Sequence, residues 1–247
     1  MAKRRLDRLL AGQGTQTRKE VRELIRKGRV TVNGQPEKAA DRQVEPLTDV
    51  IEVDGVPLRV REHVYIMLHK PQGVVSATED RHQPTVVDLV PPELRRKNLF
   101  PAGRLDKDTE GLLLLTDDGP LGHALLSPKN HVDKVYYAKV EGRLDRTDAE
   151  ALAAGMVLGD GLHCLPAELE PLGDGSQCHV TLREGKYHQV KRMLAARGKP
   201  VVYLKRLSMG PIALDPALAP GEWRPLTGEE KALLRRGTAG DPGFSAF

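Results

Sequence analysis

Aromatic residues and cysteines are scarce in this chain of 247 residues. Aromatic side chains make up 4% of it, and its two cysteines, Cys164 and Cys178, lie in no CxxC pair and at no metal-ligand spacing. They are therefore predicted to be reduced, partly buried thiols without a structural zinc ion. No apolar run reaches the roughly 18 residues of a membrane-spanning helix, and the basic N-terminus lacks the apolar segment of a signal peptide. We therefore expect a cytoplasmic protein that does not enter a membrane.

Basic residues are concentrated at one end of the chain. The formal net charge of +4 is too small to identify a partner, but residues 1–30 contain ten Lys or Arg against three Asp or Glu. Arg18, Arg22 and Arg26 recur every four residues and therefore share one helix face. The nearby Arg29 and lysines add charge with no acids expected to match them. Charged faces are often merely solvated, but this excess favours a surface that binds nucleic acid.

The first 56 residues contain the helix-cap and turn signals of a small independent domain. Thr17 and Glu20 form a capping-box pattern, which predicts a helix that runs to residue 27 and stops at a glycine. Two short apolar segments then end in Asn-Gly and Asp-Gly, which are tight-turn signals between strands. The order is therefore helix, helix, strand, strand over 1–56, followed by a linker over 57–63.

The remaining chain reads as a single α+β domain over residues 64–232. Apolar runs such as GLLLLT at 111–116 predict buried strands, but helices do not alternate regularly with them. A large mixed or antiparallel sheet with flanking helices fits this order better than a doubly wound parallel sheet. Residues 233–247 end in GTAGDPGFSAF, which is interrupted by Gly and Pro, and are predicted to be a disordered tail.

Several carboxylates precede the apolar run at 111–116. The segment GRLDKDTEG is a polar loop that is anchored by the strand after it, which is a favourable place for a functional carboxylate. Asp106 and Asp108 are the rivals within it, and a surface turn with satisfied charges is the alternative. The residues alone leave these possibilities open.

The N-terminal module resembles a known RNA-binding domain. The stretch RLDRLLAGQGTQTRKEVRELIRKGRVTVNG is similar, over about residues 3–50, to the small domain named after ribosomal protein S4. The resemblance implies recognition of folded RNA by shape and phosphate contacts. The basic residues expected to make these contacts are Arg18, Lys19, Arg22, Arg26 and Arg29.

The second domain resembles the pseudouridine synthases of the ribosomal small-subunit type. The signature is GRLDKDTEGLLLLTDDG, and three further segments match in order: KPQGVVSAT, HVDKVYYAKV and EGKYHQVKRML. The match extends over about residues 3–230 and implies the family's mixed-sheet catalytic fold. It places the catalytic carboxylate at Asp106, the active-site tyrosine at Tyr136 and the basic partner of the carboxylate at Lys191.

The implied reaction needs neither a metal nor a cofactor. It breaks the bond between ribose and uracil N1, turns the base and rejoins it through C5. Asp106 would act as nucleophile or as base, a choice that the sequence leaves open, and Lys191 would keep it ionised and in place. The uridine must leave its stack, after which Tyr136 would stack on it. Arg104, Lys134 and His188 are expected to contact the RNA, whereas Tyr137 points to the opposite strand face.

The resemblance therefore predicts a monomeric enzyme that isomerises one uridine of 16S rRNA, either naked or in a small-subunit assembly intermediate. Two alternatives stay open. One is a sister synthase that acts on a uridine of 23S rRNA. The other is a catalytically idle RNA-binding factor in ribosome assembly.

Overall fold

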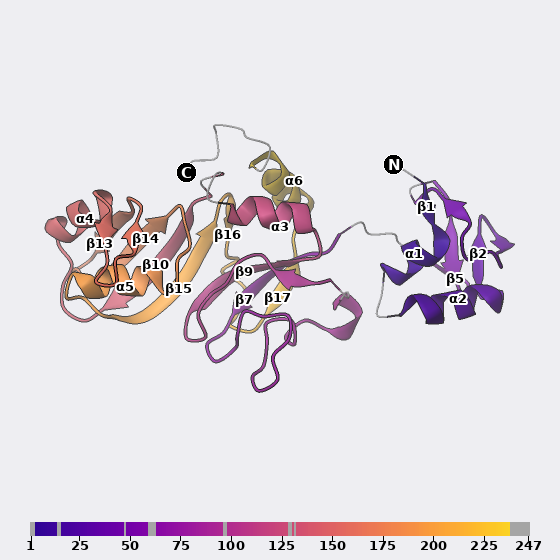
Figure 1. Cartoon of the computed structure of the whole chain (residues 1–247), viewed down its shortest axis with the longest axis horizontal. Helices are drawn as coiled ribbons and strands as arrows, with labels where there is room; N and C mark the ends of the chain where they lie inside the picture. Colours follow the sequence, from indigo (N-terminus) through magenta and orange to yellow (C-terminus); the bar gives the residue numbers. More distant parts are fainter. Residues whose placement is uncertain are drawn as a thin grey trace. The chain divides into compact units, whose positions relative to one another are not determined.

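The computed structural model describes residues 3–13, 16–46, 48–58, 63–95, 98–127, 130 and 132–237. The chain divides into two compact units (Figure 1). The small unit contains Met1–Val64 and Val90–Leu99, and the large unit contains Tyr65–Leu89 and Phe100–Phe247.

Two helices and a small sheet make up most of the small unit. Helix α2 begins with the predicted capping box, in which Thr17 and Glu20 satisfy each other's backbone N–H groups. Both predicted turns are present, because Asn33-Gly34 and Asp54-Gly55 have positive φ at both positions. The elements are α1 (Leu6–Ala11), α2 (Arg18–Arg26), a sheet in the order β3 (Gln35–Pro36), β2 (Val30–Val32), β5 (Ile51–Val53), β6 (Val56–Pro57), the separate pair β1 (Arg4–Arg5) and β4 (Gln43–Val44), and the 3₁₀ turn Pro92–Leu94.

A hydrophobic core joins these helices to the sheet. Its members include Leu6, Val21, Ile25 and Ile51, all almost fully buried. Val21 and Ile25 lie four residues apart, so one stripe of α2 is apolar and the remainder of the helix stays in contact with solvent. The basic residues of α2 are thus left on its outer surface.

A nine-stranded sheet dominates the large unit and confirms the predicted α+β class. Its pairs are antiparallel except for the parallel pair β9–β15. The main path is β13 (Glu168–Leu172), β14 (Gln177–Leu182), β10 (Lys134–Val140), β15 (Val201–Met209), β9 (Glu110–Thr116), β7 (Tyr65–Lys70) and β17 (Trp223–Pro225), with β16 (Ile212–Ala213) on β15 and β8 (Phe100–Pro101) on β9. The hairpin β11 (Met156–Val157) and β12 (His163–Cys164) lies outside it.

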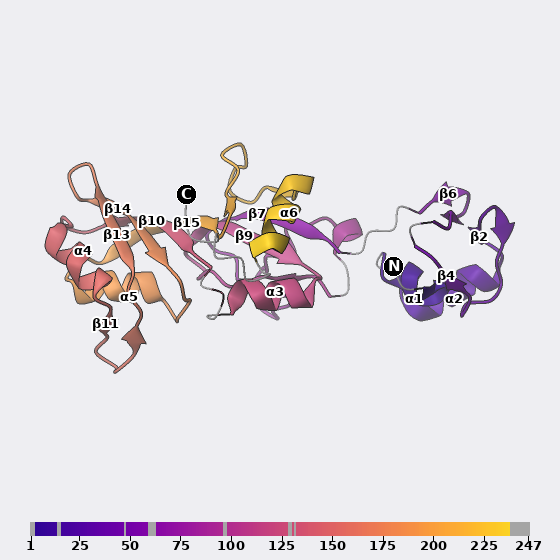
Figure 2. The ribbon, with the colours of Figure 1, turned by 90° about the horizontal axis from the view of Figure 1, so that it is seen from above.

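Helices flank this sheet in two groups. Figures 1 and 2 show α4 (Arg146–Ala153) and α5 (Gln189–Ala196) at the β13–β14 end, and α3 (Gly119–Leu126) and α6 (Gly228–Gly237) at the β7–β17 end. A core cluster that includes Leu112, Leu125 and Leu234 joins α3 and α6 to the central strands. No helix within these described ranges is long and apolar enough to cross a membrane.

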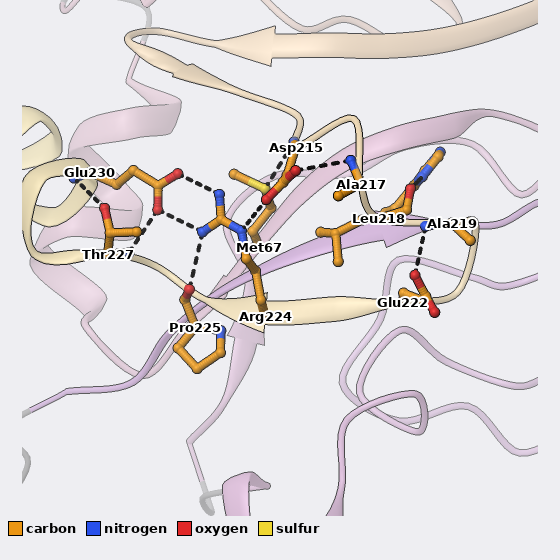
Figure 3. A network of polar contacts seen from close by, with 11 residues as sticks. Met67, Asp215, Ala217, Leu218, Ala219, Glu222, Arg224, Pro225, Thr227 and Glu230 are labelled. Atoms are coloured by element: carbon orange, nitrogen blue, oxygen red, sulfur yellow. Dashed lines mark hydrogen bonds and ion pairs between the residues drawn. The ribbon is translucent and has the colours of Figure 1, made fainter.

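The C-terminal strand and helix are connected by a charged network. Arg224 on β17 donates hydrogen bonds to Asp215 at 2.6 Å and to both carboxylate oxygens of Glu230 on α6 at 2.7 and 2.8 Å (Figure 3).

The prediction of a disordered tail was wrong for residues 233–237, which belong to helix α6. Leu234 there is 1% exposed, so burial in the core outweighs the polar, Gly-rich context. Residues 238–247 lie outside the described chain.

Candidate active site

A fully buried lysine organises the loop that carries Asp106. Lys70 ends β7, and its ammonium donates hydrogen bonds of 2.9–3.3 Å to four backbone carbonyls. Burial lowers the pKa of Lys70 to about 8, against the opposing influence of Asp108 and Asp106. The four carbonyls belong to Pro71, Asp106, Lys107 and Thr109. One cation therefore fixes the path of the chain on both sides of Asp106.

The loop after β7 adds a second attachment. Ser76 Oγ donates to the carbonyl of Leu105 at 2.8 Å and accepts from its N–H at 3.0 Å. The N–H of Gly73 donates to the carbonyl of Lys107 at 2.8 Å. The KPQGVVSAT segment thus holds Asp106 from both neighbouring residues, although the two segments lie about 30 positions apart.

Two basic side chains from the start of α5 face the Asp106 carboxylate. Lys191 Nζ lies 3.3 Å from Asp106 Oδ2, and His188 Nε2 lies 3.4 Å from Oδ1. The Asp106 side chain is 26% exposed, so its carboxylate remains accessible to a substrate. The structure therefore brings three of the predicted site residues together, from segments that are far apart in the sequence.

Lys191 also pairs, at a shorter distance, with the rival carboxylate. Its Nζ lies 2.5 Å from Asp108 Oδ1, and this hydrogen bond lowers the pKa of Asp108. The Asp108 side chain is 72% exposed, so solvent screens its charge much more than that of Asp106. The two aspartates share one cation but differ strongly in their contact with water.

The turn that presents His188 is held by buried polar groups. Gln189, 4% exposed, donates to Glu184 Oε1 at 2.6 Å, and its own Oε1 accepts the N–H of Lys186 at 3.0 Å. Glu184 Oε1 also accepts the N–H of Leu165 at 2.8 Å. His188 itself has φ of +50°, a left-handed conformation that persists only where the surroundings enforce it.

Tyr136 lies on β10, in register with Arg206 of β15. It is 8% exposed and makes no hydrogen bond or ion pair with Asp106, Lys191 or His188. Tyr137 points to the other face of the sheet and donates a hydrogen bond to Gln177, which fits the predicted alternation of the strand.

Lys134 does not lie where an RNA contact requires it. The side chain is buried, and Nζ donates to the carbonyl of Val132 at 3.0 Å. Burial and the neighbouring Arg206 lower the pKa of Lys134 to about 8. Side chains alternate along β10, so Lys134 is buried on the same face as Tyr136, two residues later. The prediction that Lys134 contacts RNA is therefore wrong. Arg104, in contrast, is exposed and forms no ion pair with the described residues.

Arg206 is a buried cation that the sequence interpretation missed. It is 2% exposed, lies beside Tyr136 in the β10–β15 register, and donates through Nε to the carbonyl of Leu112 at 2.8 Å. One terminal nitrogen of its guanidinium has no partner in the described chain. The available signal was an arginine at an inward position of the strand VVYLKRLSM. Lys70 and Ser76 were missed as well, because a buried role for a polar residue needs distant partners.

The basic face of the small unit has more acidic partners than its sequence suggested. Arg22 donates to the buried Asp7 at 3.0 Å and Arg26 to Glu23 at 2.7 Å, whereas Arg29 pairs with Asp54 at 2.5 Å. The expectation that Arg29 and Lys27 have no matching acids was therefore wrong, because the fold brings Asp54 to Arg29, and Lys27 lies 3.7 Å from Glu23 one turn earlier on the helix. Arg18 and Lys19 are exposed and pair with no acid in the described ranges.

Metal ligands do not gather in the described ranges, where no group of three His, Cys, Asp or Glu side chains could hold an ion. Both cysteines are buried, as predicted. The chemistry available at the loop is thus a carboxylate between a lysine and a histidine, next to a second, more exposed carboxylate.

Comparison with known proteins gives this arrangement a family. Residues 64–196 match the RNA pseudouridylate synthase family, and residues 4–51 match the S4 domain. The chain therefore belongs to the RNA pseudouridylate synthases, and it is an RNA pseudouridine synthase with an N-terminal S4 domain. Both resemblances seen in the sequence are confirmed.

Individual relatives are similar over nearly their whole length. An uncharacterized RNA pseudouridine synthase of Bacillus subtilis is 52% identical, covering 93% of this chain and 98% of that protein. A protein of Pseudomonas aeruginosa named ribosomal small subunit pseudouridine synthase A is 44% identical, covering 92% and 98%. A crystal structure of a pseudouridylate synthase superimposes with a TM-score of 0.66 at 40% identity, covering 93% and 99%.

Proposed function

We propose that this protein isomerises one uridine of 16S rRNA to pseudouridine, with Asp106 as the reacting carboxylate. The observation that carries the proposal is the Asp106 side chain, 26% exposed and 3.3–3.4 Å from Lys191 and His188. The choice of 16S rRNA is supported by the similarity to proteins named ribosomal small subunit pseudouridine synthase A, including that of Escherichia coli, which is 44% identical.

The chemistry explains why this carboxylate needs such surroundings. The bond between ribose C1′ and uracil N1 breaks, the base turns, and C1′ bonds to C5; N1 gains a proton and C5 loses one. An ionised carboxylate can attack the sugar as a nucleophile or remove a neighbouring proton as a base. Lys191 and His188 each lie against one oxygen of the Asp106 carboxylate, at 3.3 and 3.4 Å, and orient it. The carbonyls fixed by Lys70 hold it in place before the RNA arrives.

The remaining site residues act on the RNA. Tyr136 stacks on the uracil once the nucleotide has left its helix, a contact worth roughly 1–3 kcal/mol by comparison with other base–aromatic contacts. Arg104, exposed next to the Asp106 loop, contacts the backbone or fills the space of the extruded base. We assign catalysis to residues 64–232.

Residues 1–56 supply further affinity through phosphate contacts. Arg18 and Lys19 carry this role most directly, since no acid in the described chain neutralises them. Arg26 and Arg29 would exchange their exposed ion pairs for phosphates at little cost, whereas Arg22, half exposed, would contact a phosphate while keeping its pair with the buried Asp7. The working form that we propose is a cytoplasmic monomer.

Asp106→Asn tests the assignment, and Asp108→Asn is its matched control in the same loop. With 16S rRNA that carries tritium at uracil C5, Asp106→Asn should release no tritium, while its affinity for RNA stays within about threefold of the wild type. Asp108→Asn should retain most of its turnover because its carboxylate is 72% exposed. Turnover by Asp106→Asn, or loss of turnover only in Asp108→Asn, would reject Asp106.

The substrate is tested separately with 16S rRNA, small-subunit assembly intermediates and 23S rRNA in parallel. Primer-extension mapping in a strain that lacks the protein then locates the uridine. We expect one site in 16S rRNA to lose its modification. Modification of 23S rRNA alone would favour the sister synthase, and no modification of any of these would favour a binding factor.

A further inference from the structure

Tyr187 is an exposed aromatic ring directly beside the proposed reaction centre. Its exposed fraction is 73%, the highest among the large hydrophobic side chains of the described chain. Its ring stacks on that of His188, with centroids 3.9 Å apart and planes 17° apart. Because His188 also lies 3.4 Å from the Asp106 carboxylate, the aromatic pair connects the reacting group to the surface.

The backbone turn that carries the pair is held by several polar contacts. The turn under it is tied by Gln189 and Glu184, both buried, and Lys186 donates to the carbonyl of His163 as well as pairing with Glu184 at 3.0 Å. The left-handed φ of His188 is maintained by these contacts. An exposed aromatic ring that is ordered in advance loses little entropy when a ligand stacks on it.

Charge near the ring does not favour a phosphate as its ligand. Lys186 is neutralised by Glu184, and Arg192 forms a 2.5 Å ion pair with Asp160. The ring offers instead a neutral aromatic surface, since Tyr187 is 73% exposed even though it stacks on His188. Single-stranded RNA recognition uses such faces to stack unpaired bases.

We propose that Tyr187 and His188 form a stacking platform for the unpaired base of the nucleotide next to the target uridine. Tyr187 is next to His188 in the chain and stacks on its ring, and His188 Nε2 lies 3.4 Å from the Asp106 carboxylate. A uridine that reacts at Asp106 therefore places its neighbour within reach of Tyr187. The inference rests on the proposed function and adds that the enzyme selects an unstacked flanking base as well as the uridine.

Substitutions at Tyr187 separate stacking from apolar contact. Tyr187→Ala and Tyr187→Leu should raise KM for the rRNA about 5- to 150-fold, the range that corresponds to the loss of one base–aromatic stack, whereas Tyr187→Phe should stay within about twofold. Single-turnover kcat at saturating RNA should change less than threefold, because the ring does not touch the reacting atoms. Val157→Ala, an equally simple truncation of an exposed side chain on β11, controls for nonspecific effects.

A double-mutant cycle, which combines Tyr187→Ala with removal of one RNA base, identifies the base that stacks on Tyr187. Once the modified uridine is mapped, an rRNA fragment is made with an abasic ribonucleotide beside it on either side. Removal of the base that stacks on Tyr187 should weaken binding of the wild type 5- to 150-fold and that of Tyr187→Ala less than twofold. Equal losses in both proteins at both positions, or an unchanged KM for Tyr187→Ala, would overturn the platform. Modification of 23S rather than 16S rRNA would reject the proposed substrate but leave the same cycle measurable on the 23S fragment.

Discussion

Replacing Lys70 with methionine should separate the stability of the fold from the geometry of the Asp106 loop. Two of the four carbonyls that Lys70 holds, those of Asp106 and Lys107, also accept a backbone N–H. For the other two, of Pro71 and Thr109, Lys70 is the only donor among the side-chain and loop hydrogen bonds of the described residues. Methionine has a similar length and fits an apolar site, but it donates nothing.

The two free-energy terms of this substitution nearly cancel. Two buried carbonyls without a partner cost about 2–6 kcal/mol together. Burial lowers the pKa of Lys70 from 10.5 to about 8, so keeping the ammonium charged at neutral pH costs about 3 kcal/mol, and methionine removes this cost. We therefore expect the free energy of unfolding to change by about 3 kcal/mol or less.

Activity should respond much more strongly than stability. With its anchor lost, the backbone around Asp106 is free to shift, and a displacement of about 1 Å can lower the rate about 100-fold. Single-turnover tritium release measures the rate, and hydrogen exchange of residues 103–111 measures the order of the loop. Lys139→Met, which removes an exposed lysine from β10, is the control. A rate within threefold of the wild type, or unchanged exchange in the loop, would refute the anchoring role of Lys70.

Three further perturbations follow from buried or exposed groups. Gly111→Ala should lower the free energy of unfolding in urea by about 3 kcal/mol or more, because φ of Gly111 is +110° and the added Cβ would lie 2.2 Å from the carbonyl oxygen of Arg206. Gly119→Ala is the control. A Cβ at Gly119 meets no atom within 4 Å, so the free energy of unfolding should change by less than about 1 kcal/mol. Burial lowers the pKa of Lys134 in the folded protein to about 8, against about 10.4 in the unfolded chain. Between about pH 8 and pH 10.4 the folded state therefore binds fewer protons than the unfolded state. Over this range the free energy of unfolding of the wild type should rise by about 3 kcal/mol relative to that of Lys134→Met. If the two free energies of unfolding differed by the same amount at every pH in this range, the lowered pKa of the buried Lys134 would be contradicted. Combined Arg18→Gln and Lys19→Gln should reduce the salt slope of RNA binding by about two, with unaltered thermal unfolding, and an unchanged slope would remove both from the RNA contacts.

Local patterns in the sequence were sufficient for much of the secondary structure. The capping box at Thr17, the two Asn-Gly and Asp-Gly turns and the apolar run of β9 all have their predicted form. Each depends on residues that are neighbours in the chain, so no tertiary partner is needed to specify it. Helices α3 and α6 were missed, because their apolar residues acquire a direction only when the sheet lies beside them.

The candidate site was located by the sequence only in outline. The loop with Asp106 and Asp108 was recognisable as polar residues ahead of a buried strand, and the family motif favoured Asp106. Only the tertiary structure shows Lys191 shared between both carboxylates, from a helix 83 positions away from Asp108. Their different exposure is likewise a property of the folded loop.

The sequence by itself thus determined many of the element types, the two resemblances and the loop that contains Asp106 and Asp108. The tertiary structure decided which of these residues face one another. It buried Lys134, matched Arg22 with Asp7, and converted Lys70 from a strand-end lysine into the anchor of the loop. The physical reason is that capping, turns and periodicity act within a few residues, whereas the burial and pairing of charges depend on groups that folding brings together from distant parts of the chain.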